Sequence, residues 1–302
     1  MTYPTRRVPA VARRLAPAEH ARPMTIALLG TGLLGAGMVE NLLAKGNPVR
    51  IWNRTRDKLA PLVQRGAVAA DDPADCVRNA SRVHLVLAED TAVDAVLSAL
   101  QPALGAGVAV YDHSTNLPAK VKARCAALRA AGVRYVPAPV FMSPNNAREA
   151  SGLMLVAGAA AEADRHVATL QPMTGKVWHV GEADDLAAVY KLAGNSMFFA
   201  LAAALADVIA IGAGSGVPAD RMLALFEVFK PGAALPFLGQ RIARAGSGPA
   251  SFELAMARKD AALMQQAAGK APLLVLPAVA AAMDRALAKG RGRDDYAVFT
   301  TG

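Results

Sequence analysis

Three glycines near the start of the chain have the spacing of a phosphate-binding turn. Gly30, Gly32 and Gly35 follow an apolar run at 26–29 and precede a segment with helical character. Without a Cβ, the first glycine permits a tight turn, the second lets backbone amides approach a pyrophosphate, and the third lets the helix pack on the strand. We expect a dinucleotide-binding βαβ unit here, with an incidental glycine-rich turn as the alternative. The cofactor-binding residues expected in this turn are Gly30, Thr31, Gly32, Leu33, Leu34 and Gly35.

The tip of the second apolar run, about twenty residues further on, indicates which dinucleotide binds. A site for NAD usually has an aspartate or glutamate there, which binds both ribose hydroxyls and repels a 2′-phosphate. This chain has Asn53, Arg54 and Thr55 instead, and a guanidinium suits a phosphate dianion. We expect NADP(H) rather than NAD. The alternative is a solvated basic loop, and Arg56 and Lys58, each taken singly, fit that alternative better.

A proton donor is the other group that hydride transfer to a carbonyl requires. Lys191 stands near the start of a long apolar stretch, and Asn195 falls one helical turn further on the same face. A lysine among alanines and leucines is either a surface residue with an extended stem or a desolvated acid or base. Taken alone, Lys191 fits the surface alternative better.

The overall composition limits the class of protein to which the chain can belong. The chain has 302 residues and 54% hydrophobic content, enough for two cores. Its two cysteines are too few for a disulfide framework, so we expect a reducing, cytoplasmic location. The five histidines are scattered, so we expect no metal site and histidines that are structural or exposed.

The formal net charge is +9, and residues 1–23 contribute +4 of it, from five arginines against one glutamate. The remainder is modest for a protein that attracts a polyanionic cofactor, and no interleaving of aromatic and basic residues indicates a nucleic-acid surface. We therefore expect no nucleic-acid partner. Residues 1–23 lack the apolar core of a signal peptide and are expected to form a disordered basic extension, with Met24 as an alternative start.

Strand and helix signals alternate in the first half of the chain. Strands are expected at 26–29, 49–52, 67–69, 82–87, 107–111, 133–136 and 152–157, with helices at 56–65, 72–79, 91–100, 117–131 and 161–173. This alternation predicts an α/β Rossmann-type domain at 24–185 with one doubly wound, mostly parallel sheet. The residues after it predict an all-α domain at 186–302 that binds substrate and forms a homodimer. Its helices are expected at 187–213, 218–229, 235–244, 252–268 and 273–289.

The most apolar stretch, 197–211, is interrupted by Asp207. No run reaches the roughly 18 uninterrupted apolar residues of a membrane span. We therefore expect a buried helix there and no membrane partner.

Five motifs in register resemble the β-hydroxyacid dehydrogenases. This family includes 3-hydroxyisobutyrate dehydrogenase, the tartronate, glyoxylate and succinic semialdehyde reductases, and a more distant 6-phosphogluconate dehydrogenase branch. The resemblance covers about residues 24–300. The segments that carry it are the glycine turn, Asp112 to Pro118, Ala138 to Val140, Lys191 to Asn195 and Arg258 to Asp260.

The resemblance assigns roles to the two residues of the long apolar stretch. Lys191 is similar to the catalytic lysine, which donates a proton to the carbonyl oxygen during reduction and removes it during oxidation. Asn195 is similar to the residue one turn along that binds the substrate. The resemblance thus reverses the preference for Lys191 as a surface residue.

Further cofactor and substrate contacts follow from the same resemblance. Ser114 and Thr115 are similar to the element beside the nicotinamide ribose, and Ser114 is also expected to contact substrate. Lys259 resembles a lysine that closes onto the cofactor, and Asp260 its companion at the substrate. An ordinary surface ion pair is the alternative for those two residues. The loop expected to contact the cofactor after the fourth strand consists of Leu87, Ala88 and Glu89.

The chain departs from the family where the substrate carboxylate is bound. The family usually has Ser-Gly-Gly after Ala-Pro-Val, whereas Phe141, Met142 and Ser143 follow here. We expect these three residues to contact the substrate without the glycine amides that bind an anion. Either the substrate is larger and less polar, or other side chains replace the amides, and packing of Phe141 and Met142 in the core is an equal alternative. The candidate replacement donors are Ser143, Asn145, Asn146 and Arg148.

The expected function is hydride transfer between NADP(H) and a small β-hydroxy acid or aldehyde acid, with Lys191 as general acid and base. One alternative is an enzyme similar to the imine reductases, which usually have aspartate or tyrosine at the position of Lys191. The other is a catalytically silent dehydrogenase-like module for dimerisation, against which the presence of Lys191 and Asn195 argues.

Overall fold

The computed structural model describes residues 25–301, and the expectations for 1–23 lie outside them. The described residues divide into two compact units, 25–191 and 192–301. Helix α8 (Leu186–Gly214) contains this division, whereas the sequence placed the boundary at the start of that helix. Lys191 therefore belongs to the first unit and Asn195 to the second.

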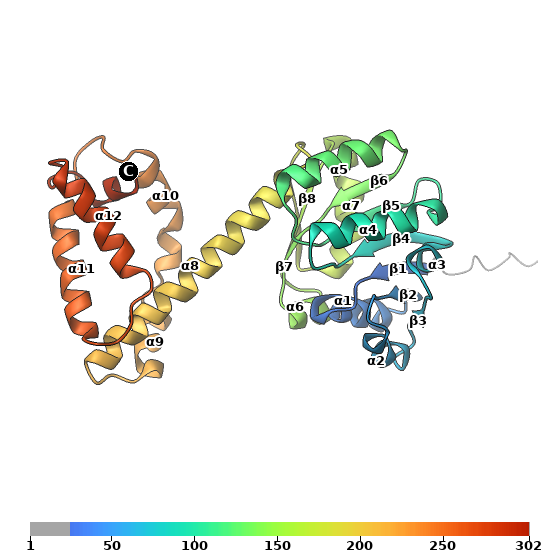
Figure 1. Ribbon diagram of the computed structural model, residues 1–302, viewed down its shortest axis with the longest axis horizontal. Coiled ribbons are helices and arrows are strands. Elements are labelled where there is room, and N and C mark those ends of the chain that lie inside the picture. The colour runs from blue at the N-terminus through green and yellow to red at the C-terminus, as the bar shows by residue number, and fades with distance from the viewer. Residues whose placement is uncertain (1–24, 302) are drawn as a thin grey trace, which may run out of the picture. The chain divides into compact units, whose positions relative to one another are not determined.

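The first unit is built on a parallel sheet of six strands in the order β3-β2-β1-β4-β5-β6 (Figure 1). The strand order reverses between β1 and β4, and ligands of such sheets bind outside the carboxyl ends of the strands at this point. In register, Leu29 at the end of β1 pairs with Trp52 and Leu85. The strands are β1 (Thr25–Leu29), β2 (Val49–Trp52), β3 (Val68–Ala69), β4 (Ala80–Leu85), β5 (Ala109–Asp112) and β6 (Arg134–Pro137).

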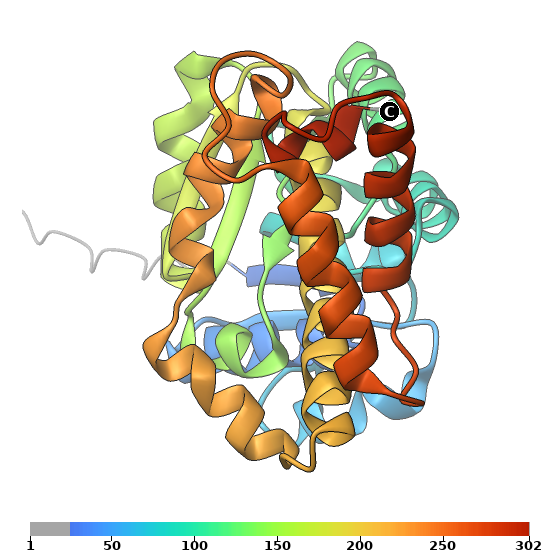
Figure 2. The same cartoon turned by 90° about the vertical axis from the view of Figure 1, so that its left-hand side faces the viewer.

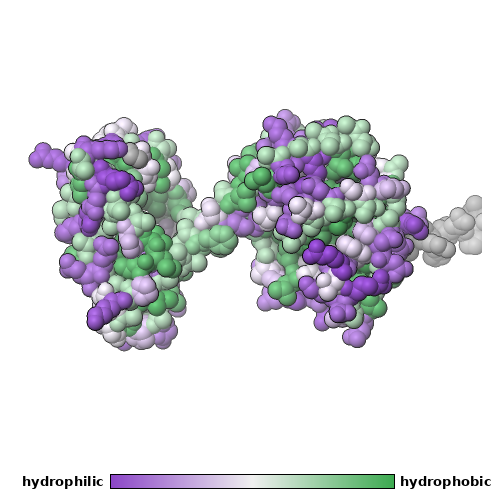
Figure 3. Space-filling model, in the orientation of Figure 1, coloured by the Kyte–Doolittle hydropathy of each residue, from purple (hydrophilic) through white to green (hydrophobic). Residues whose placement is uncertain are grey.

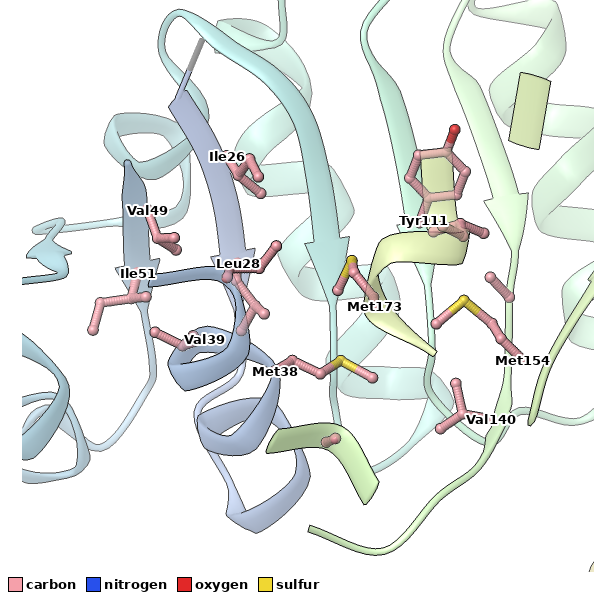
Figure 4. Packing of buried hydrophobic residues seen from close by; sticks show 14 of the residues in the cluster. Ile26, Leu28, Met38, Val39, Val49, Ile51, Tyr111, Val140, Met154 and Met173 are labelled. Carbon is pink, nitrogen blue, oxygen red and sulfur yellow. The ribbon is translucent and has the colours of Figure 1, made fainter. Parts of the chain in front are cut away.

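Both faces of this sheet are buried, which explains the continuous apolar runs of its strands. Alternate residues of β1 point to opposite faces, so Ile26 and Leu28 join one core, and Ala27 and Leu29 the other. Figure 4 shows the first core, where Met38 packs below the strand residues. Helices α1 (Leu33–Ala44) and α2 (Ala60–Val63) contribute to the first core. Helices α3 (Pro73–Val77), α4 (Asp90–Leu100) and α5 (Pro118–Ala130) contribute to the second.

The prediction of one sheet up to residue 185 is wrong in one respect. The predicted strand at 152–157 belongs to a separate three-stranded sheet in which β8 (Leu153–Ala157) is antiparallel to β7 (Val140–Phe141) and parallel to β9 (Lys176–Gly181). The cause is a reversal of the chain after β6, because β7 and helix α6 (Pro144–Glu149) turn it back before β8 begins. Helix α7 (Ala160–Leu170) connects β8 to β9.

The second unit is helical, as the sequence predicts, apart from one isolated bridge between Glu253 and Asp295. Helices α11 and α12 lie side by side (Figure 2) and share one apolar core. Asp207, which interrupts the apolar stretch of α8, accepts hydrogen bonds from the backbone amides of Leu274 and Leu276 at 2.5 and 2.7 Å. The helices that follow α8 are α9 (Ala219–Val228), α10 (Leu235–Ala243), α11 (Leu254–Ala268) and α12 (Leu276–Ala288).

The expectation of a buried helix at 197–211 is wrong for the single chain. Phe198 and Phe199 on α8 are 65% and 73% exposed, and hydrophobic side chains lie along the surface of this helix (Figure 3). By length and composition alone, α8 would suffice to span a membrane, and α9 with the following segment would do so only as a bent pair. The absence of a membrane partner stays a prediction.

Candidate cofactor and catalytic site

The glycine turn between β1 and α1 has the geometry that the sequence predicts. Gly30 has a φ of +101°, and a Cβ on it would lie 2.1 Å from the carbonyl oxygen of Val86. A Cβ on Gly35 would lie 1.9 Å from the carbonyl oxygen of Gly30, so neither position accepts a side chain. A Cβ on Gly32 would meet nothing within 4 Å. The open side of Gly32, at the start of α1, is where a pyrophosphate would approach.

Asn53 joins the tip of β2 to the glycine turn. Its Oδ1 accepts a hydrogen bond from the backbone amide of Thr31 at 3.0 Å, and its Nδ2 donates to the carbonyl of Thr55 at 2.9 Å. The hydroxyl of Thr31 is buried and has no hydrogen-bond partner among the described residues. An unsatisfied buried hydroxyl costs free energy, so a ligand group at this turn would stabilise it. Both features fit a bound dinucleotide.

A cavity of about 280 Å³ lies between the glycine turn, the tip of β2 and the start of α4. Arg54 and Lys58 line it, whereas Arg56 does not and pairs with Asp71 at 3.2 Å instead. Arg56 therefore fits the solvated alternative that the sequence favoured for it, whereas Lys58, for which the sequence favoured the same alternative, lines the cavity. Its lining residues are Gly30, Gly32, Trp52, Asn53, Arg54, Thr55, Lys58, Val86, Leu87, Ala88, Ala92, Ala95 and Val96. The sequence prediction missed Trp52, Lys58 and the α4 residues, although their positions at the end of β2, just beyond it and after β4 were a usable signal.

The other residues expected to contact the cofactor differ in their surroundings. Leu33 is exposed, and Leu34 packs partly against the core of the first unit. Glu89 precedes α4, is exposed and does not line the cavity. Thr115 is exposed just beyond the end of β5. Contacts of these four residues with a cofactor stay predictions.

The loops after β4 and β5 meet through a direct hydrogen bond. The backbone amide of Leu87 donates to the hydroxyl of Ser114 at 2.9 Å, so two loops that the resemblance assigned to the cofactor do lie together. Ser114 is held in turn by Asp112, whose Oδ1 accepts its backbone amide at 2.9 Å. Tyr135 donates to the other oxygen of Asp112 at 2.6 Å, and Asn116 does so at 2.7 Å. The sequence prediction missed this supporting network. Tyr135 lies 23 residues from Asp112 along the chain, and the short-range bonds of Asp112 to Ser114 and Asn116 depend on the turn that follows β5.

Lys191 and Phe141 also come together. The Nζ of Lys191 lies 4.4 Å from the centre of the Phe141 ring, the geometry of a cation–π contact. Burial lowers the pKa of the Lys191 amine, because a low-dielectric setting disfavours its charged form. Close by on α8, Tyr190 packs edge-on against Trp178 of β9, with 5.3 Å between ring centres. The first turns of α8 are thus held against the small sheet of the first unit.

The segment after Phe141 is part of a helix start. Ser143 caps α6, since its hydroxyl accepts the backbone amide of Asn146 at 3.2 Å and the Oδ1 of Asn146 accepts the backbone amide of Ser143 at 2.9 Å. Met142 packs partly against the core. Arg148 donates to Glu40 at 2.6 Å and to Asn145 at 2.9 Å. Ser143, Asn146 and Arg148 are therefore engaged within the protein, and Asn145 accepts a hydrogen bond through its Oδ1. Substrate contacts of Met142 and Ser143 stay predictions.

The second unit contains the remaining predicted residues. Asn195 is half-buried on α8. On α11, Lys259 is exposed and Asp260 is half-buried, and the two form an ion pair of 3.0 Å. This pairing is what the surface alternative describes, and the roles of these three residues at the cofactor and substrate stay predictions.

Comparison with known proteins agrees with this geometry. The family model described as the NAD binding domain of 6-phosphogluconate dehydrogenase matches residues 25–181. The chain is 26% identical to the uncharacterized oxidoreductase YfjR of Bacillus subtilis, over 91% of this chain and 98% of that protein. It is 25% identical to 3-sulfolactaldehyde reductase of Escherichia coli, over 91% of this chain and 94% of that protein.

Solved structures share the fold at low sequence identity. The imine reductase from Myxococcus stipitatus, in complex with NADP+, has a TM-score of 0.80 at 22% identity, covering 92% of this chain and 99% of that one. A variant of the same enzyme in complex with NAD+ has a TM-score of 0.81 at 21% identity, covering 93% and 99%. At this level of identity, the likeness concerns the fold alone.

Proposed function

Because this chain belongs to the 6-phosphogluconate dehydrogenase family of NAD-binding proteins, we propose that it transfers hydride between NADP(H) and a small β-hydroxy acid or aldehyde acid. That it is an NAD(P)-binding oxidoreductase follows from the family and from relatives that are reductases and dehydrogenases. The proposed mechanism rests on the contact of Lys191 with Phe141. This contact places a proton donor with a lowered pKa against an aromatic ring.

The cavity beside the glycine turn supports the choice of NADP(H). Arg54 and Lys58 bring two positive charges to it, and none of the described residues that line it carries a carboxylate. A 2′-phosphate would gain charge-assisted hydrogen bonds from Arg54, and nothing in the lining would repel it. The pyrophosphate would approach the open side of Gly32, and the buried Thr31 hydroxyl would gain a partner.

Lys191 is proposed as the general acid and base. The bound cofactor supplies or accepts the hydride at its nicotinamide. In reduction, the ammonium of Lys191 donates a proton to the carbonyl oxygen as negative charge develops there, and in oxidation the neutral amine removes that proton. The Phe141 ring covers one side of the amine and excludes water from it. A lowered pKa brings the amine closer to the pH at which proton transfer in both directions is efficient.

The substrate pocket differs from one built on glycine amides. Phe141 is bulky, and Met142 packs partly in the core. The side chain of Ser143 is already hydrogen-bonded as the N-cap of α6. A substrate with an aldehyde at one end and an acidic group at the other would therefore find its anion partner elsewhere. The relative named 3-sulfolactaldehyde reductase supports a substrate class of acidic aldehydes.

Imine reduction is the second candidate, because the solved neighbours include imine reductases and Phe141 gives the site an aromatic wall. A panel of semialdehydes, hydroxy acids and cyclic imines, assayed at 340 nm with NADPH and with NADH, tests both candidates. Turnover of an acidic aldehyde that is lost in Lys191→Met supports the first candidate. Turnover of cyclic imines alone would replace it with the second. Cofactor binding without turnover of any substrate would support a silent module.

We also propose that the chain forms a homodimer through its C-terminal helices. The exposed phenylalanines of α8 would gain free energy from burial against a second copy. Sedimentation velocity measures the mass in solution, and Phe199→Asp should shift the species from dimer to monomer. A monomeric wild type would contradict this proposal, and a wild type that needs detergent to stay in solution would instead indicate a membrane partner.

A further inference from the structure

Two histidines lie in direct contact in the core of the first unit. His84 on β4 and His113 just beyond β5 are 0% and 2% exposed. The Nδ1 of His84 lies 2.9 Å from the Nε2 of His113, and the two rings stack with 5.2 Å between their centres. Both ring nitrogens of a buried imidazole need hydrogen-bond partners, because an unpaired buried polar group costs free energy. An apolar residue would fill the same space without this requirement. This pair is therefore expected to have a role beyond packing.

The hydrogen bonds of the pair run in one direction. Arg82 can only donate, so its Nε–H donates to the Nε2 of His84 at 3.1 Å. His84 then carries its proton on Nδ1 and donates it to the Nε2 of His113. His113 in turn carries its proton on Nδ1 and donates it to the carbonyl of Ala138 at 2.7 Å. All four ring nitrogens are engaged, and burial lowers the pKa of both histidines, which keeps both rings neutral.

This series of hydrogen bonds ends at Ala138, close in sequence to Phe141, whose ring contacts the proposed catalytic Lys191. Ala138 is fully buried, and its amide donates to the carbonyl of Asp112 at 2.7 Å, so both of its backbone groups are held by the region around the end of β5. The carbonyl of Pro139 accepts the amide of Leu155 at 2.9 Å. The next two residues form β7, whose second residue, Phe141, carries its ring below the amine of Lys191.

His113 also adjoins the cofactor side of the site. The residue after it, Ser114, accepts the amide of Leu87 and belongs to the element assigned to the nicotinamide ribose. One side chain at position 113 therefore connects the end of β5, next to the proposed cofactor contact, with the segment that leads to Phe141. A small change in its length or donor position would alter the distance between these two parts.

We propose that His113, held in one tautomer by His84 and Arg82, is a positioning residue that sets Phe141 and hence Lys191 relative to the cofactor element at Ser114. The inference rests on the proposed role of Lys191. It assigns to His84 and His113 no contact with substrate or cofactor. Their effect is transmitted through the carbonyl of Ala138 and the backbone of β7.

The test compares two variants of His113 with a matched histidine. His113→Leu fills similar space and removes the donor, whereas the Nδ2–H of His113→Asn takes the place of the imidazole Nδ1–H and still reaches Ala138. The control is His166, which is 7% exposed in the same unit and bonds to Tyr111 rather than to the β7 segment. His166→Leu therefore reports the cost of losing a buried histidine alone.

We expect His113→Leu to lower kcat by roughly ten- to a hundredfold, because a displacement of about 1 Å at a reacting group has effects of this size. Its Kd for NADPH should stay near that of the wild type. His113→Asn should recover kcat to within a few-fold, and His166→Leu should lower the melting temperature without this loss of kcat. Equal kcat in the Leu variants of both histidines, or an Asn variant as defective as His113→Leu, would overturn the proposal.

A second measurement is independent of the reaction. Hydrogen exchange followed by NMR reports the amides of β7 and the amide of Leu155, which is bonded to the carbonyl of Pro139. These amides should exchange faster in His113→Leu and should be protected again in His113→Asn, while β1 amides stay unchanged. If Lys191→Met kept full activity, the role of Lys191 would fail, and this exchange pattern would still test the positioning. Unchanged protection in His113→Leu would overturn it.

Discussion

The backbone amide of Thr31 donates to the side-chain oxygen of Asn53 over 3.0 Å, and this bond ties the glycine turn to the tip of β2. The bond fixes the spacing between the expected sites of the pyrophosphate and of the ribose phosphate. It also engages the side chain at the position where a site for NAD usually has an acidic residue that binds the ribose hydroxyls. We therefore expect the basic residues that line the same cavity, Arg54 and Lys58, to recognise the 2′ position of the ribose.

Replacement of Arg54 by leucine should change the cofactor preference. Loss of a charge-assisted phosphate contact costs about 1.5 to 3 kcal/mol, which corresponds to roughly ten- to a hundredfold in Kd. NADPH should bind more weakly by that factor while NADH changes little, as measured by fluorescence titration. Arg56→Leu is the matched control, because Arg56 pairs with Asp71 outside the cavity. Equal losses for both cofactors in Arg54→Leu would contradict the assignment.

Lys191→Met should remove turnover while leaving cofactor binding intact. Methionine keeps most of the bulk of the stem and has no proton to donate, so kcat should fall by about 10² to 10⁴. The Kd for NADPH should remain within about twofold of the wild type, since no part of the cofactor cavity is changed. A variant with most of its activity on a confirmed substrate would show that another group moves the proton.

The pH dependence of reduction should report the amine of Lys191. Reduction requires the ammonium form, so kcat/KM should fall as pH rises through a pKa that burial has lowered below that of an exposed lysine. Phe141→Ala admits water beside the amine and should move this alkaline limb to higher pH. The pH profile of kcat/KM for the two proteins measures the shift. An unmoved or acid-shifted limb would mean that the cation–π contact of the ring stabilises the ammonium at least as much as desolvation by the ring disfavours it.

Alanine substitutions at two glycines of the turn, Gly35 and Gly32, should have different effects on stability and cofactor binding. Gly35→Ala places a Cβ 1.9 Å from the carbonyl oxygen of Gly30, so we expect a large loss of melting temperature. Gly32→Ala has open space around its Cβ and should fold with a melting temperature close to that of the wild type. It should nevertheless bind NADPH more weakly, because the new methyl group lies where the pyrophosphate would approach. Unchanged binding in Gly32→Ala would place the phosphates elsewhere.

The sequence was sufficient for features whose cause is local. The spacing of Gly30, Gly32 and Gly35 follows from the turn itself, and the apolar strands follow from a sheet that is buried on both faces. The helical second unit follows from long apolar segments with helical periodicity. Each of these patterns is set by neighbouring residues along the chain.

Features that depend on residues far apart along the chain were not predicted from the sequence. The two-residue strand β7 has no periodicity of its own and exists because β8 pairs with it. His84 and His113 are in contact, although no sequence pattern relates the two residues. The exposure of α8 was mispredicted because an apolar helix has the same composition whether its own chain or another molecule covers it.

Substrate range should depend on the segment at Phe141 and Met142. In the resembling family small residues follow Ala-Pro-Val, but Ser143 of this chain caps α6, and its loss would cost about 1 kcal/mol of stability. The informative variant therefore changes Met142→Gly and keeps Ser143. It opens space beside a backbone amide that an anion could reach, so kcat/KM should rise for small acidic aldehydes such as glyoxylate relative to larger substrates.

Leu33→Ala, which changes an exposed residue of the glycine turn, is a control for general effects on the cofactor. A folded, NADPH-binding Met142→Gly protein with an unchanged substrate profile would show that Met142 serves packing alone, and the determinants of substrate choice would then have to come from the second unit.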